Sequence, residues 1–290
     1  MKAGSNLYDN RVTSACGPVP SRGFIIQWES SEMNRLTESI CHRLGIDDPR
    51  YIEIESKMRV LPEDAKDVRE YLLERKKIKH VKRVTFYDQF LDTPGLDLLR
   101  RGVSLRLRYK GDGTKVYLQY KGPGFHRQGL LYRSEFSSGR LNHLVREESH
   151  HDIIHFKEAS IRSILRDVDP AMSVAMRRHL GAGVIGRISR GPILCSYQKD
   201  KFRVDLGPAF LEPSLDRLFA FHINAKGPHA LSTFWEYENE IKTENEDLDA
   251  KLEFLPELVR FNKALSKEFA LKIERLDKYH RCASCFLSWD

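Results

Sequence analysis

Residues 103–109 read VSLRLRY, and after a Lys-Gly-Asp-Gly turn residues 115–121 read KVYLQYK. Apolar residues stand at every second position in both segments, which is typical of β-strands with one buried face. The two glycines of the turn allow a tight connection. The two segments are therefore predicted to form a β-hairpin.

The same alternation recurs along the chain. Six further predicted strands cover residues 51–59, 84–91, 130–136, 193–199, 202–206 and 234–242. Side chains at positions i and i+2 of a strand share a face. Sorted by that rule, one face carries eleven basic and seven acidic side chains, whereas the opposite face is apolar and includes Ile54, Leu105 and Val116.

This charged face has two interpretations. An antiparallel sheet with one face in water is the simpler one. However, Arg and Lys recur at i and i+2, where like charges repel each other unless an anion lies between them. We therefore predict an α+β fold in which about eight antiparallel strands close into a β-barrel, with the charged face inward and helices packed on the outside. The interior would be a wet, cationic tunnel, compensated by its carboxylates and a polyanion.

The chain is predicted to divide near residue 50. Residues 1–49 form an N-terminal extension with a short helix near 32–44, and residues 50–290 form the barrel domain. This domain also contains helical segments, namely a helix at 62–75, a helical insertion at 142–190 and a C-terminal helix at 255–273.

Composition limits the class of protein. Of 290 residues, 41% are hydrophobic and 31% are charged, which excludes a largely disordered chain. The net charge of +7 favours a polyanionic partner. We find no apolar stretch of the roughly 20 residues that a transmembrane helix needs, and no helix-turn-helix or zinc-finger pattern that would indicate specific DNA binding.

The cysteines indicate the compartment. Five cysteines in so long a chain favour a reduced, cytoplasmic protein over a disulfide scaffold. Cys282 and Cys285 form a lone C-x-x-C near the C-terminus, without a second ligand pair for zinc. We interpret this segment as a short tail that carries two thiols.

Carboxylates on the charged face suggest a metal site. Glu53 and Glu55 share a face, as do Glu238 and Glu240, and each pair is followed two residues later by a lysine. Carboxylate oxygens are preferred ligands of Mg²⁺ and Mn²⁺. Such a cation neutralises phosphate charge and orients a phosphoryl group, while Arg and Lys stabilise the remaining oxygens.

Several motifs on these segments resemble one superfamily. Residues 53–57, EIESK, match the E-x-E-x-K signature of the CYTH and triphosphate tunnel metalloenzyme superfamily. Residues 85–108 resemble its stretch that runs from "yfDTp" to "lRlR", and residues 121–123 resemble its strand-ending "lKgp". The resemblance covers about residues 50–280 and implies a tunnel-shaped barrel.

Three later motifs resemble the VTC branch, whose activity is polyphosphate synthesis from ATP. They are YQKDKF at 197–202, NEIK at 239–242 and LDKY at 276–279. Two positions depart from that branch. Lys199 replaces an arginine and so loses a bidentate phosphate contact, and Asp277 replaces a serine and puts an anion beside Lys278.

The resemblance also implies roles for individual residues. Catalytic roles fall to Lys57, Arg106, Arg108 and Lys121. Phosphate binding falls to Arg133, Tyr197, Lys199, Arg203, Lys242 and Lys278. Metal binding falls to Glu240, with Glu238, Glu53 and Glu55 as further candidates. For each of them the alternative is an ion pair inside the barrel.

Three functions follow as hypotheses. The first is metal-dependent phosphoryl transfer from ATP onto a polyphosphate chain, with Mn²⁺ or Mg²⁺ as cofactor. The second is a CYTH-type triphosphatase that hydrolyses tripolyphosphate or a nucleoside triphosphate. The third is a non-catalytic module that binds polyphosphate or nucleic acid.

Overall fold

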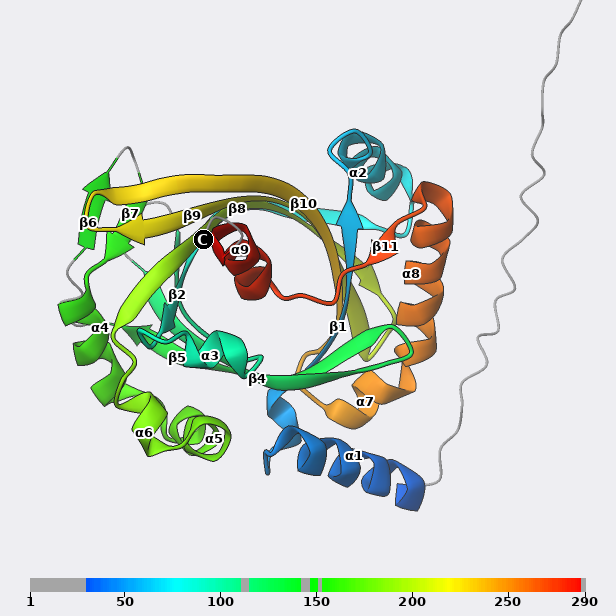
Figure 1. The fold of residues 1–290 in the computed structure, drawn as a ribbon. Helices are drawn as coiled ribbons and strands as arrows, with labels where there is room; N and C mark the ends of the chain where they lie inside the picture. Colours follow the sequence, from blue (N-terminus) through cyan, green and yellow to red (C-terminus); the bar gives the residue numbers. More distant parts are fainter. Residues whose placement is uncertain (1–29, 111–114, 142–146, 151–152, 288–290) are drawn as a thin grey trace, which may run out of the picture.

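Eight antiparallel strands form a closed ring in the computed structural model, which describes residues 30–110, 115–141, 147–150 and 153–287 (Figure 1). Each strand pairs with the next around the ring, and β10 pairs with β1 to close it. The strands are β1 (Ile52–Val60), β2 (Lys79–Asp92), β3 (Ser104–Lys110), β4 (Val116–Arg127), β5 (Leu130–Leu141), β8 (Arg190–Asp205), β9 (Ala209–Asn224) and β10 (Gly227–Thr243). The predicted barrel is confirmed.

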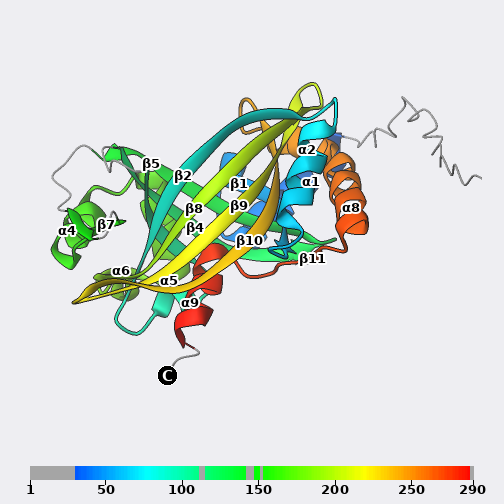
Figure 2. The same cartoon turned by 90° about the horizontal axis from the view of Figure 1, so that it is seen from above.

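The apolar face of the strands points outward and is covered by helices. Ile54, Leu105 and Leu107 are fully buried in the main hydrophobic core. The covering helices are α1 (Ser30–Leu44), α2 (Ala65–Glu74), α4 (Glu158–Ile164), α5 (Pro170–Leu180), α6 (Ala182–Ile185), α7 (Leu248–Glu253) and α8 (Leu255–Phe269). The smaller elements are α3 (Asp97–Arg100), β6 (Glu147–His150), β7 (Ile153–Phe156) and β11 (Lys272–Ile273). Figure 2 shows α1, α2 and α8 gathered at one side of the barrel.

One helix differs from the expected outer position. Helix α9 (Lys278–Leu287) lies within the ring in Figure 1 and packs on inner-face residues of the strands. Tyr279 stacks on Phe90 with ring centroids 4.8 Å apart, and Cys282 is buried in the same cluster beside Cys195 and Tyr197. The interpretation of this segment as a short tail is therefore wrong, because α9 fills one end of the barrel with apolar side chains.

The strand prediction differs from the structure in two places. The segments 193–199 and 202–206 belong to one strand, β8, and the whole of β9 is missing from the prediction. Pro213 lies within β9 and hides it, because proline is rare in central strands. Strand β9 pairs with β8 and β10 along its length and supplies acidic side chains to the interior.

Smaller differences concern the ends of elements. The helical insertion at 142–190 also contains the β6–β7 hairpin, and the helix predicted at 255–273 ends at Phe269. Residues 1–29 of the predicted extension and the predicted turn at 111–113 lie outside the described residues. None of the helices in the described part of the chain is long and apolar enough to cross a membrane.

Candidate functional site

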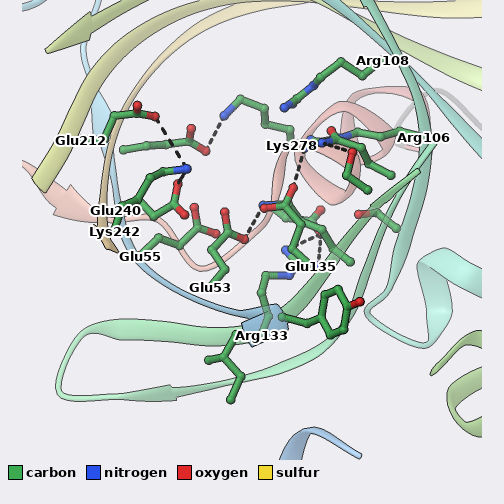
Figure 3. A pocket seen from close by; sticks show the side chains of 18 of the residues that line it. Glu53, Glu55, Arg106, Arg108, Arg133, Glu135, Glu212, Glu240, Lys242 and Lys278 are labelled. Atoms are coloured by element: carbon green, nitrogen blue, oxygen red, sulfur yellow. Dashed lines mark hydrogen bonds and ion pairs between the residues drawn. The ribbon is translucent and has the colours of Figure 1, made fainter. Parts of the chain in front are cut away.

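The inner faces of the strands enclose a cavity of about 680 Å³, which we call the cup (Figure 3). Thirteen of the fourteen residues given site roles from sequence lie in its wall or directly behind it. The charged lining includes Glu53, Glu55, Lys57, Arg106, Arg108, Lys121, Arg133, Glu135, Lys199, Lys201, Glu212, Glu238, Glu240, Lys242, Asp277 and Lys278. Tyr197 lies behind this wall, and Arg203 lies further out on β8.

Side chains that line the cup differ in exposure. That of Lys242 is 29% exposed, whereas those of Lys278 and Arg133, near α9, are 5% and 3% exposed. Tyr279 of α9 also lines the cavity. The cup is therefore open at the rim and closed at the α9 end.

Two arginines of β3 are held by one carboxylate that the sequence analysis missed. Asp88 on β2 is fully buried and accepts two hydrogen bonds from Arg108, both at 2.8 Å, while Arg106 Nη1 lies 3.0 Å from its Oδ2. Burial alone would raise the pKa of Asp88, but the two guanidinium groups outweigh it and lower the pKa to about 2. Asp88 thus fixes both arginines in the wall.

Tyr197 completes this group. Its hydroxyl accepts a hydrogen bond from Arg108 at 2.6 Å and donates one to Asp88 at 3.2 Å. Tyr197 is 1% exposed, so it positions the arginine and the carboxylate from behind the wall. The signal that could have identified Asp88 is the pairing of its strand with β3, in which Asp88 stands directly opposite Arg108.

A second group lies on β4, β5 and β1. Lys121 binds Glu53 and lies 3.6 Å from Glu135. Burial would raise the pKa of Glu53, but Lys121 outweighs it and lowers this pKa strongly. Nearer the floor, Arg133 lies 3.3 Å from Asp277. The carboxylate of Asp277, which was predicted to lie beside Lys278, therefore forms an ion pair with Arg133.

The floor is a network of ion pairs around Lys278, the first residue of α9. Its ammonium group contacts Glu236 Oε1 at 2.9 Å, Asp216 Oδ2 at 3.1 Å, and Glu238. Oxygens of these three carboxylates lie within 4.8 Å of one another, which is close enough to hold a metal ion. The ammonium group of Lys278 already lies among these three carboxylates, so it supplies the positive charge that a metal ion would otherwise supply.

Two other predicted phosphate-binding lysines join this network. Lys199 lies 2.7 Å from Glu238 and 3.3 Å from Asp216, and Lys57 lies 3.3 Å from Glu238. Burial would raise the pKa of Glu238, but Lys199, Lys278 and Lys57 together hold it well below its usual value. Glu238 is therefore bound by three lysines, which leaves it poorly placed as a metal ligand.

Glu240 is different, because its charge is poorly compensated. It stands directly opposite Glu55 in the β1–β10 pairing, and Lys242 lies 3.0 Å away. Burial, together with the charges of Glu53 and Glu135, raises the pKa of Glu240 to about 8 despite Lys242. Glu55 Oε1 is also buried, and its partner is the ammonium group of Lys57 at 3.2 Å.

Three of the predicted metal ligands line the cup together. Glu53, Glu55 and Glu240 face the same part of the cup in Figure 3. Carboxylate oxygens are the ligands that Mg²⁺ and Mn²⁺ prefer. In the described part of the chain, however, the acidic group whose oxygens lie within 4.8 Å of one another is Asp216, Glu236 and Glu238. Of the four predicted metal ligands, Glu240 has the most poorly compensated charge, because its pKa is raised.

The charge of the cup is nearly balanced. Its lining holds eleven Lys or Arg and nine Asp or Glu residues. Asp88, Asp216 and Glu236, which are fully buried, add three more carboxylates around the wall and floor. The interior is therefore less cationic than predicted, because β2 and β9 bring in Asp88, Glu212 and Asp216, which the predicted strand faces did not include.

Comparisons with known proteins agree with this architecture. The CYTH domain family matches residues 51–207. No curated protein matches the chain. A solved structure from Hippeastrum, described as a proposed adenylyl cyclase with a dominant triphosphatase activity, is 18% identical with a TM-score of 0.50, and the match covers 80% of this chain and 95% of that one.

Two further solved structures resemble the chain more distantly. One is described as a proposed adenylate cyclase from Bacillus halodurans, 18% identical with a TM-score of 0.45, covering 79% of this chain and 96% of that one. The other is the triphosphatase of a Mimivirus capping enzyme, 9% identical with a TM-score of 0.34, covering 80% and 99%. Because the family match spans more than half of the residues and the Hippeastrum structure has the same fold, the chain belongs to the CYTH domain family.

Proposed function

We propose that the protein is a metal-dependent triphosphatase, which hydrolyses a triphosphate whose terminal phosphates enter the cup from the rim. The observation that carries this proposal is the closed floor. Helix α9 fills the far end of the barrel with apolar side chains, and Lys278 ties it to carboxylates of β9 and β10. A closed cup accommodates the end of a phosphate chain and a water molecule.

The charge balance supports the need for a metal. The cations of the cup already have carboxylate partners, so its side chains alone do not neutralise a triphosphate. A divalent cation held by Glu53, Glu55 and Glu240 would supply the missing positive charge and would polarise the phosphoryl oxygens. It also relieves the repulsion between Glu240 and Glu55.

The protein's own groups then orient the substrate. Arg106 and Arg108 are fixed by Asp88 and present planar guanidinium groups, which suit bidentate contacts with phosphate. Lys121 adds a compact charge from the neighbouring strand β4, and its position beside Glu53 places it next to the proposed metal site. Positioned charges of this kind account for most of the catalysis in phosphoryl transfer.

Polyphosphate synthesis from ATP remains a prediction. A polymerase must hold a nucleotide and also give the growing chain a way out, and the filled α9 end favours hydrolysis over that route. The non-catalytic binding module also remains a prediction, since a charged cup can bind phosphate without hydrolysing it.

Phosphate release separates the three functions. The protein is incubated with tripolyphosphate or ATP, with Mg²⁺, Mn²⁺ or a chelator, and orthophosphate and polymer are measured. We expect metal-dependent orthophosphate without polymer. Glu240→Gln should lower the rate by at least about 10-fold, because loss of even an outer-shell partner of a metal costs about 10–100-fold. Glu268→Gln, an exposed change on α8, is the matched control. Long polymer from ATP, or binding without turnover, would contradict the proposal.

A further inference from the structure

The inner face of β2 and β8 continues beyond the rim of the cup as a basic surface. Lys199 and Lys201 line the cup, and Arg203 follows them on the same face of β8. On β2, Lys82 stands opposite Lys201, and Lys79 stands opposite Arg203. Helix α9 packs near the other end of this face, at Cys195, so these residues lie on the open side. We call Lys79, Lys82, Arg203 and Phe210 the lip strip.

A β-bulge creates this arrangement. The register of β2 against β8 shifts between His80 and Lys82, which leaves Val81 as an extra residue. Without the extra residue, Val81 would stand opposite Lys201. With it, Lys82 takes that position, and the side chain of Val81 is left 52% exposed. Bulges of this kind re-aim side chains next to functional sites.

The lip strip holds like charges at close range. Two successive cross-strand pairs on one face, Lys82 with Lys201 and Lys79 with Arg203, are destabilising unless an anion lies between them. Asp205 pairs with both Lys79, at 2.8 Å, and Arg203, and Glu212 lies 2.7 Å from Lys201. Among the residues that the structure describes, no carboxylate lies within ion-pair distance of Lys82. The basic groups therefore exceed their acidic partners.

Phe210, the remaining member of the lip strip, holds Arg203 in place. The guanidinium group of Arg203 lies 3.8 Å from the ring centre of Phe210, which is an attractive cation–π distance. Phe210 itself lies opposite Lys242 of the cup rim, so the strip is continuous with the cup. From Lys199 to Arg203 the strand rises about 13 Å, which leaves room for several phosphates.

We propose that the lip strip is an outer phosphate-binding site, which holds the part of a substrate's phosphate chain that extends out of the cup. This inference rests on the proposed function, because it assumes that the terminal triphosphate lies in the cup. The ligand chemistry is a chain of phosphates, supplied either by inorganic polyphosphate or by the backbone of a 5′-triphosphorylated RNA.

Charge-neutral substitutions test the strip. Lys79→Gln with Lys82→Gln removes two exposed charges, and Lys263→Gln with Lys267→Gln on α8 removes two others as the matched control. For tripolyphosphate, kcat and KM should stay unchanged in both variants. For long-chain polyphosphate and a 5′-triphosphorylated RNA, KM should rise about tenfold in the lip variant alone, because each lost phosphate contact weakens charge-driven binding.

Binding measured without hydrolysis distinguishes a failure of this inference from a failure of the proposed triphosphatase function. Anisotropy of labelled polyphosphate and of a 5′-hydroxyl RNA, with a chelator present, reports on the strip even if the wild type hydrolyses nothing. The slope of log K against log salt is negative, and its magnitude should fall by about 1.4 in the lip variant, since each of the two lost single-stranded contacts contributes about 0.7. An effect on only one ligand supports the strip and identifies the source of the chain. Unchanged binding and KM for both ligands would overturn the inference.

Discussion

Replacing Lys278 by methionine tests whether α9 is held in the barrel by charge. The ammonium group of Lys278 lies among Asp216, Glu236 and Glu238, and its side chain is 5% exposed. Methionine has a similar length but no charge. The substitution therefore leaves three buried carboxylates short of one cation, without opening a large cavity.

The expected loss of stability depends on the ion-pair partners that the three carboxylates keep. Removing one member of a buried ion pair costs about 3–5 kcal/mol. Here Lys199 still lies 2.7 Å from Glu238 and 3.3 Å from Asp216, and Arg281 still lies 3.2 Å from Glu236. We expect the lower end of that range, about 3 kcal/mol. A change of that size lowers Tm by roughly 6–12 °C in a large domain.

Thermal unfolding by circular dichroism, with a chelator present, measures this loss. Lys278→Arg is the matched control and should retain most of the stability. Lys278→Ala should be as unstable as the methionine variant, but Mn²⁺ should restore part of its Tm, because the three carboxylates then have room for a divalent cation. A methionine variant that melts within about 2 °C of the wild type would refute the argument that these ion pairs hold α9, since about 3 kcal/mol predicts three times that shift.

Three further predictions concern the wall and the floor. Asp88→Asn should lower kcat/KM for tripolyphosphate by roughly 10–100-fold with a smaller effect on KM, because its two arginines lose their fixed orientation. Tyr279→Phe should cost about 2 kcal/mol in urea unfolding, because Asp92 loses the hydrogen bond that the phenol donates at 2.7 Å. For His280, burial lowers the pKa, but Asp277 outweighs burial and raises it above 6.5. The stabilisation that protonated His280 provides is complete below about pH 6.5 and is lost as the pH rises through the raised pKa of His280. The Tm advantage of the wild type over His280→Asn should therefore shrink between about pH 6 and pH 9. An advantage that grows with pH would contradict this assignment.

The barrel wall was predictable because its strands keep strict alternation. In β1 and β3, every second residue except Ser56 is apolar, and these apolar residues are buried in the outer core while Glu53 and Arg106 line the cup. A period of two is a local property of the backbone, so it can be recognised without knowing any partner strand. The same rule placed Glu240 and Lys242 on the inner face of β10.

Strand β9 shows where that rule fails. It contains Pro213 and has apolar residues on both faces near α9, so its alternation is weak. With β9 unrecognised, Asp216 and Glu212 were absent from the predicted interior. The β-bulge at Val81 was hidden for a related reason, because a bulge is defined by the register of two strands that lie far apart in the sequence.

The alternation of residue types alone determined which side chains of β1, β3 and β10 lie inside the barrel, because a strand's two faces are set by its own backbone. Only the tertiary structure decided which of those charges are free to meet a ligand. Lys278 was expected to bind phosphate, yet the insertion of α9 brings it to Asp216, Glu236 and Glu238. Electrostatic partners are chosen by distances in space, which depend on ring closure and on where the last helix packs, and these distances have no signature in the local sequence.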